Sequence, residues 1–281
     1  KHVPWKAFGV GTVAGMCGSF AGMGGGFIMI PLLTASTASA RWLGGGIGLS
    51  QHMAHGTSLF AVASTGLAGS LGYGLRDVVQ LDVAAALAAC GMITAHLGAA
   101  SISRFSPRTL QLCLGSLMLI VAPLVPAKSY FEQQHNLSSS KIKTETTSIQ
   151  QQIPNETTNQ QQMTKLLSAG MIGLGSGFLA GLLGVGGGSL VVPALTLSTD
   201  MTHYQALATS LCAMTLPAMV GVWTHYRRGN FAMRVAPTLA LGSFIGAYVG
   251  GKVALQLPQD KLRWGFSGLM LFLGTKTLLR I

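Results

Sequence analysis

The chain has 281 residues, of which 49% are hydrophobic and only 9% charged, and its formal net charge is +11. Soluble globular domains carry about 25% charged residues, so this composition excludes an ordinary soluble enzyme and gives no reason to expect a nucleic-acid partner. We expect an integral, multi-pass membrane protein without catalytic residues, surrounded by a lipid bilayer.

Charge-poor apolar segments follow one another along the chain, at residues 7–33, 46–71, 80–102, 109–126, 166–197, 205–224, 235–256 and 265–281. Most of them can cross a bilayer as a helix, which takes about 20 residues. Segments such as 83–100 have no polar face at helical spacing, which is typical of membrane helices. The predicted fold is all-α, a polytopic membrane protein with about eight transmembrane helices.

A glycine block in the first segment is repeated in the fifth. Residues 11–34 and 173–196 each contain Gly-Gly-Gly followed by a proline inside apolar sequence. Aligned pairs are Gly11 with Gly173, Gly15 with Gly177, Gly22 with Gly184, Gly24 to Gly26 with Gly186 to Gly188, Pro31 with Pro193 and Thr34 with Thr196. Glycines at matching positions indicate one backbone shape made twice, so we predict two homologous halves.

Residues 128–164 between the copies are rich in Gln, Asn, Ser and Thr. Such a segment buries too little apolar area to order itself, so a disordered polar linker is expected. It separates a first transmembrane repeat at residues 1–127 from a second at 165–281.

The Lys and Arg residues set the expected orientation, because cytosolic loops carry an excess of them. With four spans per half, this excess places both termini and the linker in the cytosol and makes the two halves parallel, which is the arrangement we favour. Alternatively, segments 7–33 and 166–197 form helical hairpins, and the halves are then inverted. The sequence specifies no organelle, the plasma membrane being one candidate, and no oligomeric state.

The glycine blocks are the first candidate site. Three consecutive glycines cost about 1 kcal/mol each in a helix relative to alanine, so we predict that helices 1 and 5 break there. A helix that restarts after a break presents free N–H groups and its positive end to an anion. Candidate substrate-binding residues are Gly24, Gly25, Gly26, Pro31, Gly186, Gly187, Gly188 and Pro193. The alternative is that these glycines only allow close helix packing.

A second repeated pair carries hydroxyl groups. Thr57-Ser58 aligns with Thr209-Ser210, each near the start of an apolar segment. Hydroxyls in membrane helices bind ligands or bond to the carbonyl of the preceding turn. Because the pair recurs in register, we include all four residues among the candidate substrate ligands.

Histidines offer two further possibilities. His52 and His55 are three residues apart and suggest a transition-metal permease as a rival function, although the aligned residues are Tyr204 and Leu207. His96, deep in a segment, is a candidate for proton coupling or a neutral hydrogen-bonding group. The apolar segments contain no Asp or Glu apart from Asp82 at the beginning of one of them. We therefore expect neither a cofactor nor a resident metal ion.

Three motifs in order carry a resemblance: "GFLAGLLGVGGGSLVVPALT", "ALATSL" and "HYRRGNF". Together they resemble the sulfite exporter TauE/SafE family, also called the sulfonate uptake permease family. The resemblance implies a multi-pass permease for sulfite, sulfonates or other organosulfur anions and places the glycine-proline and Thr-Ser motifs on the residues above. The first half departs from the pattern at residues 72–77, which lack the His-containing loop, and has an extra segment around 41–51.

The predicted function is therefore transport of a small anion held between the two glycine blocks, by alternating access between the two repeats. The rivals are the metal permease and a membrane scaffold or receptor that keeps the fold and transports nothing.

Overall fold

The computed structural model describes residues 3–34, 47–74, 78–120, 122–123, 156–199 and 201–279, and the statements below concern these residues. They form helices joined by turns, without a β-strand, so the all-α prediction is confirmed. The predicted linker lies outside the described residues as far as residue 155.

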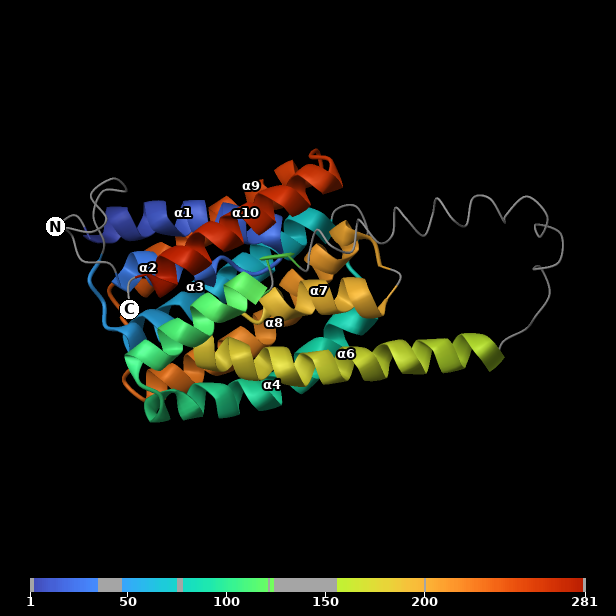
Figure 1. The fold of residues 1–281 in the computed structure, drawn as a ribbon, viewed down its shortest axis with the longest axis horizontal. Coiled ribbons are helices and arrows are strands. Elements are labelled where there is room, and N and C mark those ends of the chain that lie inside the picture. The colour runs from blue at the N-terminus through green and yellow to red at the C-terminus, as the bar shows by residue number, and fades with distance from the viewer. Residues whose placement is uncertain are drawn as a thin grey trace.

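The helices before the linker are α1 (Val3–Ala21), α2 (Gly26–Thr34), α3 (Gln51–Gly74), α4 (Leu81–Ser101), the short 3-10 helix η2 (Ile102–Arg104) and a helix at residues 107–120. Those after it are α6 (Glu156–Leu183), α7 (Gly188–Ser198), α8 (His203–Arg227), α9 (Ala236–Ala254) and α10 (Gln259–Leu278). Figure 1 shows them as one elongated bundle. Helix α6 extends back to residue 156, so residues 156–164 are helical although we expected them in the linker.

Local sequence explains where α8 begins. The hydroxyl of Thr202 accepts from the backbone N–H of Gln205, and the Gln205 side chain accepts from the N–H of Thr202 at 3.0 Å. This capping box satisfies two donors that the first turn leaves unpaired. It fixes the beginning of α8 just ahead of the Thr209-Ser210 pair.

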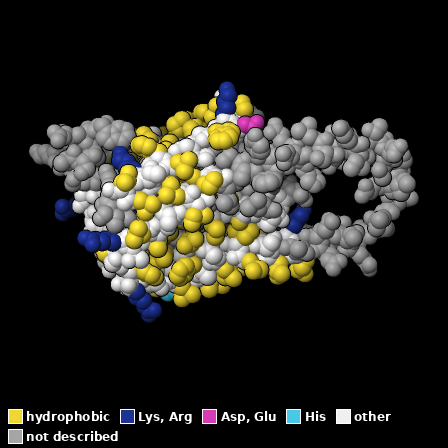
Figure 2. Space-filling model, viewed as in Figure 1, with side chains coloured by type: hydrophobic (Ala, Val, Ile, Leu, Met, Phe, Trp, Pro, Cys, Tyr) yellow, Lys and Arg dark blue, Asp and Glu magenta, His cyan; other side chains and the backbone are white. Residues whose placement is uncertain are grey.

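Three of the described helical segments are long and apolar enough to cross a membrane: Leu81–Arg104, Lys165–Leu183 and His203–Arg227, with mean hydropathies of 1.7, 1.8 and 1.6. Figure 2 shows apolar side chains over the flank of the bundle, while the visible Lys and Arg side chains lie toward its ends and edges. This distribution suits an integral membrane protein.

The tightest helix pairs join the two halves of the sequence. Helix α1 packs along α9, and α6 packs along α4, while α3 and α8 lie against each other between these pairs. Glycines allow the close approach: a Cβ at Gly11 would lie 2.2 Å from the Leu239 carbonyl, and one at Gly173 would lie 2.6 Å from the Leu87 carbonyl. These two contacts join equivalent positions of the aligned halves.

The equivalent helices run in opposite directions, which corrects the expectation of parallel halves. Thr57, near the start of α3, accepts from the N–H of Ala232 just beyond α8, and Thr209, near the start of α8, accepts from the N–H of Gln80 just beyond α3. Helices α3 and α8 are therefore antiparallel. In Figure 1, α1 and α6 likewise begin at opposite ends of the bundle, so the N-terminal end and the end of the linker do not share one side as we had expected. The hydropathy of a segment does not show whether it crosses the membrane once or folds back as a helical hairpin, so it did not reveal this direction.

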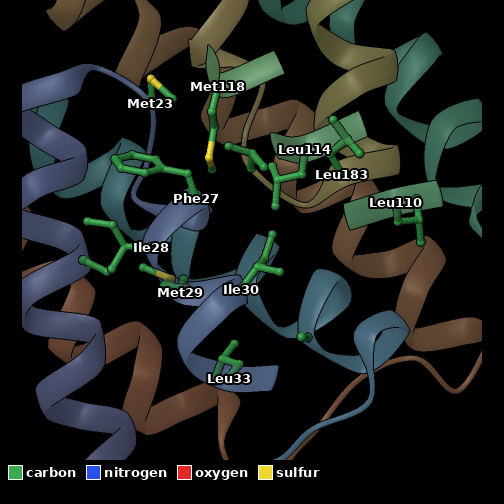
Figure 3. Packing of buried hydrophobic residues seen from close by; sticks show 14 of the residues in the cluster. Met23, Phe27, Ile28, Met29, Ile30, Leu33, Leu110, Leu114, Met118 and Leu183 are labelled. Carbon is green, nitrogen blue, oxygen red and sulfur yellow. The ribbon is translucent and has the colours of Figure 1, made fainter. Parts of the chain in front are cut away.

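Helix α2 fills the middle of the bundle. Figure 3 shows Phe27, Ile28, Met29, Ile30 and Leu33 of α2 among side chains of the helix at 107–120. All five are buried on every side of the helix. A helix that is apolar on all sides is typical of a protein core or of a lipid-facing span, and the burial of these side chains places α2, with the glycine turn before it, inside the protein.

Candidate functional site

The two glycine blocks form matching turns. Helix α1 ends at Ala21 and α2 begins at Gly26; between them Gly22, Gly24 and Gly25 have φ angles of 65°, 77° and 73°. Helix α6 ends at Leu183 and α7 begins at Gly188, and the φ angles of Gly184, Gly186 and Gly187 are 66°, 92° and 69°. Glycine tolerates these left-handed angles far better than other residues. Each helix therefore ends at its block and a shorter one restarts.

The turns touch each other across the interior. A Cβ at Gly26 would lie 2.5 Å from the carbonyl oxygen of Gly184, and one at Gly188 would lie 2.3 Å from that of Gly22. The N-terminal ends of α2 and α7 consequently meet in the middle of the bundle. The glycine blocks therefore both end a helix and allow close packing of the two turns.

Val62 of α3 and Met214 of α8 flank the junction of the turns. A Cβ at Gly24 would lie 2.7 Å from Val62 and 3.1 Å from Met214, and one at Gly186 would lie 2.5 Å and 3.1 Å from the same two side chains. Sequence reasoning missed this pair. Val62 aligns with Met214 once the Thr-Ser motifs are superimposed, and that shared register was the available signal.

The two serines tie each half to the turn of the other half. Ser58 Oγ donates to the carbonyl of Gly184 at 2.9 Å, and Ser210 Oγ donates to the carbonyl of Gly22 at 2.8 Å. Ser58 also lies 2.9 Å from the His55 carbonyl. Both serines are fully buried. Their hydroxyl hydrogens are therefore already engaged by the protein backbone.

The two threonines accept rather than donate. Thr57 Oγ1 accepts from the N–H of Ala232 at 3.0 Å, and Thr209 Oγ1 accepts from the N–H of Gln80 at 3.1 Å. Both threonines are fully buried. The structure thus brings the two serine hydroxyls to the turns. The two threonine hydroxyls instead brace the segments that follow α8 and α3.

Several backbone N–H groups in the glycine turns have no hydrogen-bond acceptor among the described residues. The N–H groups of Gly22 and Met23 bond to the carbonyls of Ser19 and Gly18. Turn amides that bond to no acceptor among the described residues are those of Gly24, Gly25, Val185, Gly186 and Gly187. All four glycines are buried. Buried N–H groups are nearly always paired in proteins, so these donors call for an acceptor.

The prolines and the space around the turns complete the geometry. Pro31 and Pro193 lie inside α2 and α7, one turn or more beyond the glycines. Next to Gly186 and Met214 is a cavity of about 10 Å³, which holds at most one water molecule. An oxyanion needs more room, so the interior is closed between the turns. A larger cavity of about 330 Å³ lies between the C-terminal end of α1 and α10, and Ala21, which directly precedes the Gly22 turn, is among its lining residues.

The histidines are distributed differently from the expectation. His96 is exposed on α4, with Nδ1 3.0 Å from Thr224 Oγ1. His55 and His225 are fully buried instead. His225 belongs to the last turn of α8, just ahead of Arg227 and Arg228.

His55 lacks a free nitrogen for a metal. Its Nδ1 lies 2.5 Å from the Leu183 carbonyl, and its Nε2 lies 3.1 Å from Nε2 of Gln51. Among the described residues, no group of three or more His, Cys, Asp or Glu side chains is arranged to hold a metal ion. The pair of His52 and His55 therefore does not form the metal site considered from the sequence.

The chain is similar to one protein family over almost its whole length. A family model described as Sulfite exporter TauE/SafE matches residues 7–277. No solved structure gives a significant match.

Curated bacterial proteins are also similar to it. YdhB of Bacillus subtilis (strain 168), named a probable membrane transporter protein, is 32% identical over 93 residues, which are 32% of this chain and 37% of YdhB. YunE of the same strain, with the same description, is 26% identical over 246 residues, covering 87% of this chain and 86% of YunE. A probable membrane transporter protein of Xylella fastidiosa (strain 9a5c) is 24% identical over 257 residues, covering 90% and 85%.

Proposed function

This chain belongs to the sulfite exporter TauE/SafE family of membrane transporters, and we propose that its cargo is a small oxyanion, in particular sulfite or an organic sulfonate. The anion binds between the two glycine turns, at the point where the N-terminal ends of α2 and α7 meet. The protein acts as a permease and makes no covalent change in its cargo.

The observation that carries this proposal is the set of turn amides without an acceptor. Gly24 and Gly25 in one turn, and Gly186 and Gly187 in the other, offer N–H donors beside two helix N-termini. Helix N-termini attract anions through these donors and through the helix dipole. An oxyanion has several acceptor oxygens and fits two converging sets of donors.

The hydroxyl groups have a secondary part in this site. Ser58 and Ser210 donate to turn carbonyls in the closed state, and Thr57 and Thr209 accept from backbone N–H groups. A hydroxyl has one donor and two acceptor positions. Because no acceptor for the threonine hydrogens is found within the described part of the chain, these hydrogens can turn toward an anion, while the serines keep the turns in place.

The groups of helices that move during alternating access each contain helices from both halves of the chain. Helix α1 packs on α9, which packs on α3; helix α6 packs on α4, which packs on α8. We propose that these two groups of helices move against each other along the contact of α3 with α8. Such a movement opens the closed space beside Val62 and Met214 to one side of the membrane and then to the other. Inverted repeats commonly surround a transporter's central site in this way.

Counterflow in liposomes tests the cargo. The purified full-length chain is reconstituted, and exchange of radiolabelled sulfite, methanesulfonate, sulfate and nickel is measured. We expect exchange of sulfite or methanesulfonate above that of empty liposomes. Exchange of nickel alone would favour the metal permease, and exchange of none of the four would favour the scaffold; either result contradicts the proposal.

The amide site is tested with Gly24→Ala and Gly186→Ala. The added methyl group would enter the junction and meet the Val62 and Met214 side chains, which can move, whereas alanine at Gly25 would meet the Ala14 carbonyl at 2.1 Å. Gly48→Ala is the matched control, since Gly48 has a φ of 73° and open space around it. We expect exchange to fall at least about tenfold in the two site variants and to persist in the control. Normal exchange by both site variants would refute the site.

A further inference from the structure

The C-terminal end of α6 is held by two buried histidines. His55 Nδ1 lies 2.5 Å from the carbonyl of Leu183, and His225 Nε2 lies 3.0 Å from the carbonyl of Gly181. These carbonyls belong to the last turn of α6, which has no intrahelical donors for them. The same turn is the negative end of the helix dipole, and the Gly184 turn follows directly.

Hydrogen bonding fixes how these imidazoles are protonated. Carbonyl oxygens only accept, so Nδ1 of His55 and Nε2 of His225 carry hydrogens. Gln111 donates to Oε1 of Gln51 at 3.3 Å, so the Gln51 amide nitrogen faces Nε2 of His55 at 3.1 Å and donates to it. His55 is thus paired at both nitrogens.

Two other histidine nitrogens are buried without a hydrogen-bond partner among the described residues. They are Nδ1 of His225, which belongs to a fully buried side chain, and Nε2 of His52. Since Nε2 of His225 bears the hydrogen, its Nδ1 carries a lone pair that nothing described fills. A buried lone pair without a donor is costly. A proton added there would become a charged N–H donor, which in turn needs a negatively charged acceptor close by.

The equivalent place in the other half has no histidine. Tyr73 aligns with His225, and its hydroxyl donates to the Ser19 carbonyl near the end of α1 at 3.0 Å. Tyr204 aligns with His52 and donates to the Leu257 carbonyl. Phenols stay protonated at neutral pH, whereas imidazoles gain or lose a proton there. The two ends of the bundle therefore carry different titratable groups.

The surroundings of the cluster are free of described carboxylates. His52 and Arg228 lie within electrostatic range of His225, and His52 and His225 lie within range of His55. Helix α6 faces the cluster with carbonyls, and the helix at 107–120 adds the amide of Gln111. Arg228 also reaches Ser103 of η2. The acidic side chains with described positions, Asp82 and Asp260, begin α4 and α10 at the opposite end.

We propose that His52 and His225 form the proton-binding site that couples anion transport to protons, a proposal that rests on the oxyanion cargo proposed above. The proton adds to the free lone pair on Nδ1 of His225 or to Nε2 of His52, and no other bond breaks. The new positive charge lies at the negative end of α6 and beside the turn that receives the anion. Because the site is buried and Arg228 is close, this charge requires the negative charge of the anion. Proton and anion then travel together, which lowers the charge that has to cross the bilayer.

The test replaces each unpartnered histidine by the residue at its equivalent position. His225→Tyr, His52→Tyr and the double variant supply phenols like those of Tyr73 and Tyr204. His96→Tyr is the matched control, because His96 aligns with Tyr248 and lies on the outside of α4. Uptake of radiolabelled methanesulfonate, which stays ionised at these pH values, is measured under a pH gradient and compared with counterflow at equal pH.

We expect the ratio of gradient-driven uptake to counterflow to fall about tenfold in the double variant and to stay at the wild-type value in His96→Tyr. If the double variant does not fold, His52→Tyr alone still removes one proton acceptor from a partly exposed side chain. An unchanged ratio in the folded His52 and His225 variants, or a loss confined to His96→Tyr, would overturn the proposal.

A second measurement separates this inference from the proposed cargo. Thermal unfolding of the detergent-solubilised chain is followed from about pH 5 to pH 8, where imidazoles titrate. We expect the unfolding temperature to depend more strongly on pH in the wild type than in the double variant. If no anion is transported but this difference is present, the cargo is wrong and the proton site stands; if anions are transported and the difference is absent, the reverse holds.

Discussion

The hydroxyl of Ser210 donates a hydrogen bond of 2.8 Å to the carbonyl of Gly22, which is 188 residues earlier in the chain. Its counterpart, Ser58, donates to the carbonyl of Gly184 at 2.9 Å, across 126 residues. Each glycine turn is thus held by a serine from the other half. The closed junction depends on both halves at once.

Removing either serine hydroxyl should destabilise the protein. Ser58→Ala leaves the buried Gly184 carbonyl unpaired and Ser210→Ala does the same to Gly22, and an unpaired buried group costs about 1–3 kcal/mol. We expect a lower unfolding temperature for both variants in detergent, of similar size because the environments match. Ser70→Ala is the control, since Ser70 bonds only to Leu67 in its own helix. Equal unfolding temperatures for all three variants would contradict the bracing role.

Alanine at Gly26 or Gly188 should separate the two turns. Each added Cβ would lie within 2.5 Å of a carbonyl of the opposite turn, at 2.5 Å from Gly184 and 2.3 Å from Gly22. Since backbone has to move, we expect a loss of roughly 1–3 kcal/mol of stability. At Gly268 of α10 there is open space, and Gly268→Ala should instead stabilise its helix by up to about 1 kcal/mol. Thermal unfolding of the three variants measures the contrast.

The antiparallel halves predict which ends of the helices share a side of the membrane. In a background without the four native cysteines, we introduce Trp5→Cys in α1, Met163→Cys in α6 and Leu279→Cys after α10, positions that are 77%, 68% and 87% exposed. Figure 1 places both chain ends at one end of the bundle and the beginning of α6 at the other. A membrane-impermeant thiol reagent should therefore label positions 5 and 279 from one side and 163 from the other. Labelling of positions 5 and 163 from the same side would restore the parallel arrangement.

Shortening Met214 should loosen the junction. Met214 is 4% exposed and lines the small cavity beside Gly186, so Met214→Ala enlarges that cavity at a cost of about 2–5 kcal/mol. Met219→Ala is the control in the same helix, because Met219 is 48% exposed. We expect the Met214 variant to unfold at a clearly lower temperature than the Met219 variant. Similar temperatures would mean that the junction is not tightly packed.

Sequence patterns predicted the helical fold and the family, and they found the glycines whose backbone angles match in the two turns. Glycine spacing carries that information because few other residues tolerate the angles of Gly24 or Gly186. The direction of the second half was not predictable from hydropathy, since an apolar segment of this length either crosses once or returns as a hairpin. The excess of Lys and Arg on the expected cytosolic side was not large enough to decide between parallel and inverted halves.

The contacts within the site were harder to predict. Which carbonyl Ser58 bonds to depends on which helices meet, and a single sequence does not reveal that. The sequence analysis proposed no role for His225, which precedes two arginines at the end of α8, whereas the chain places its side chain against the end of α6. Its alignment with Tyr73, which also caps a helix end, was the missed signal.

The pairing of α1 with α9 has a consequence for how the protein is made. Ser19 of α1 donates to the carbonyl of Ala247, 228 residues further along the chain, so α1 enters the membrane long before its partner is synthesised. The small-residue face of α1 is exposed to lipid during that time, and a polypeptide ending at the linker lacks the partners that cover it. Neither half should therefore accumulate when expressed alone, while the two halves expressed together should rescue each other.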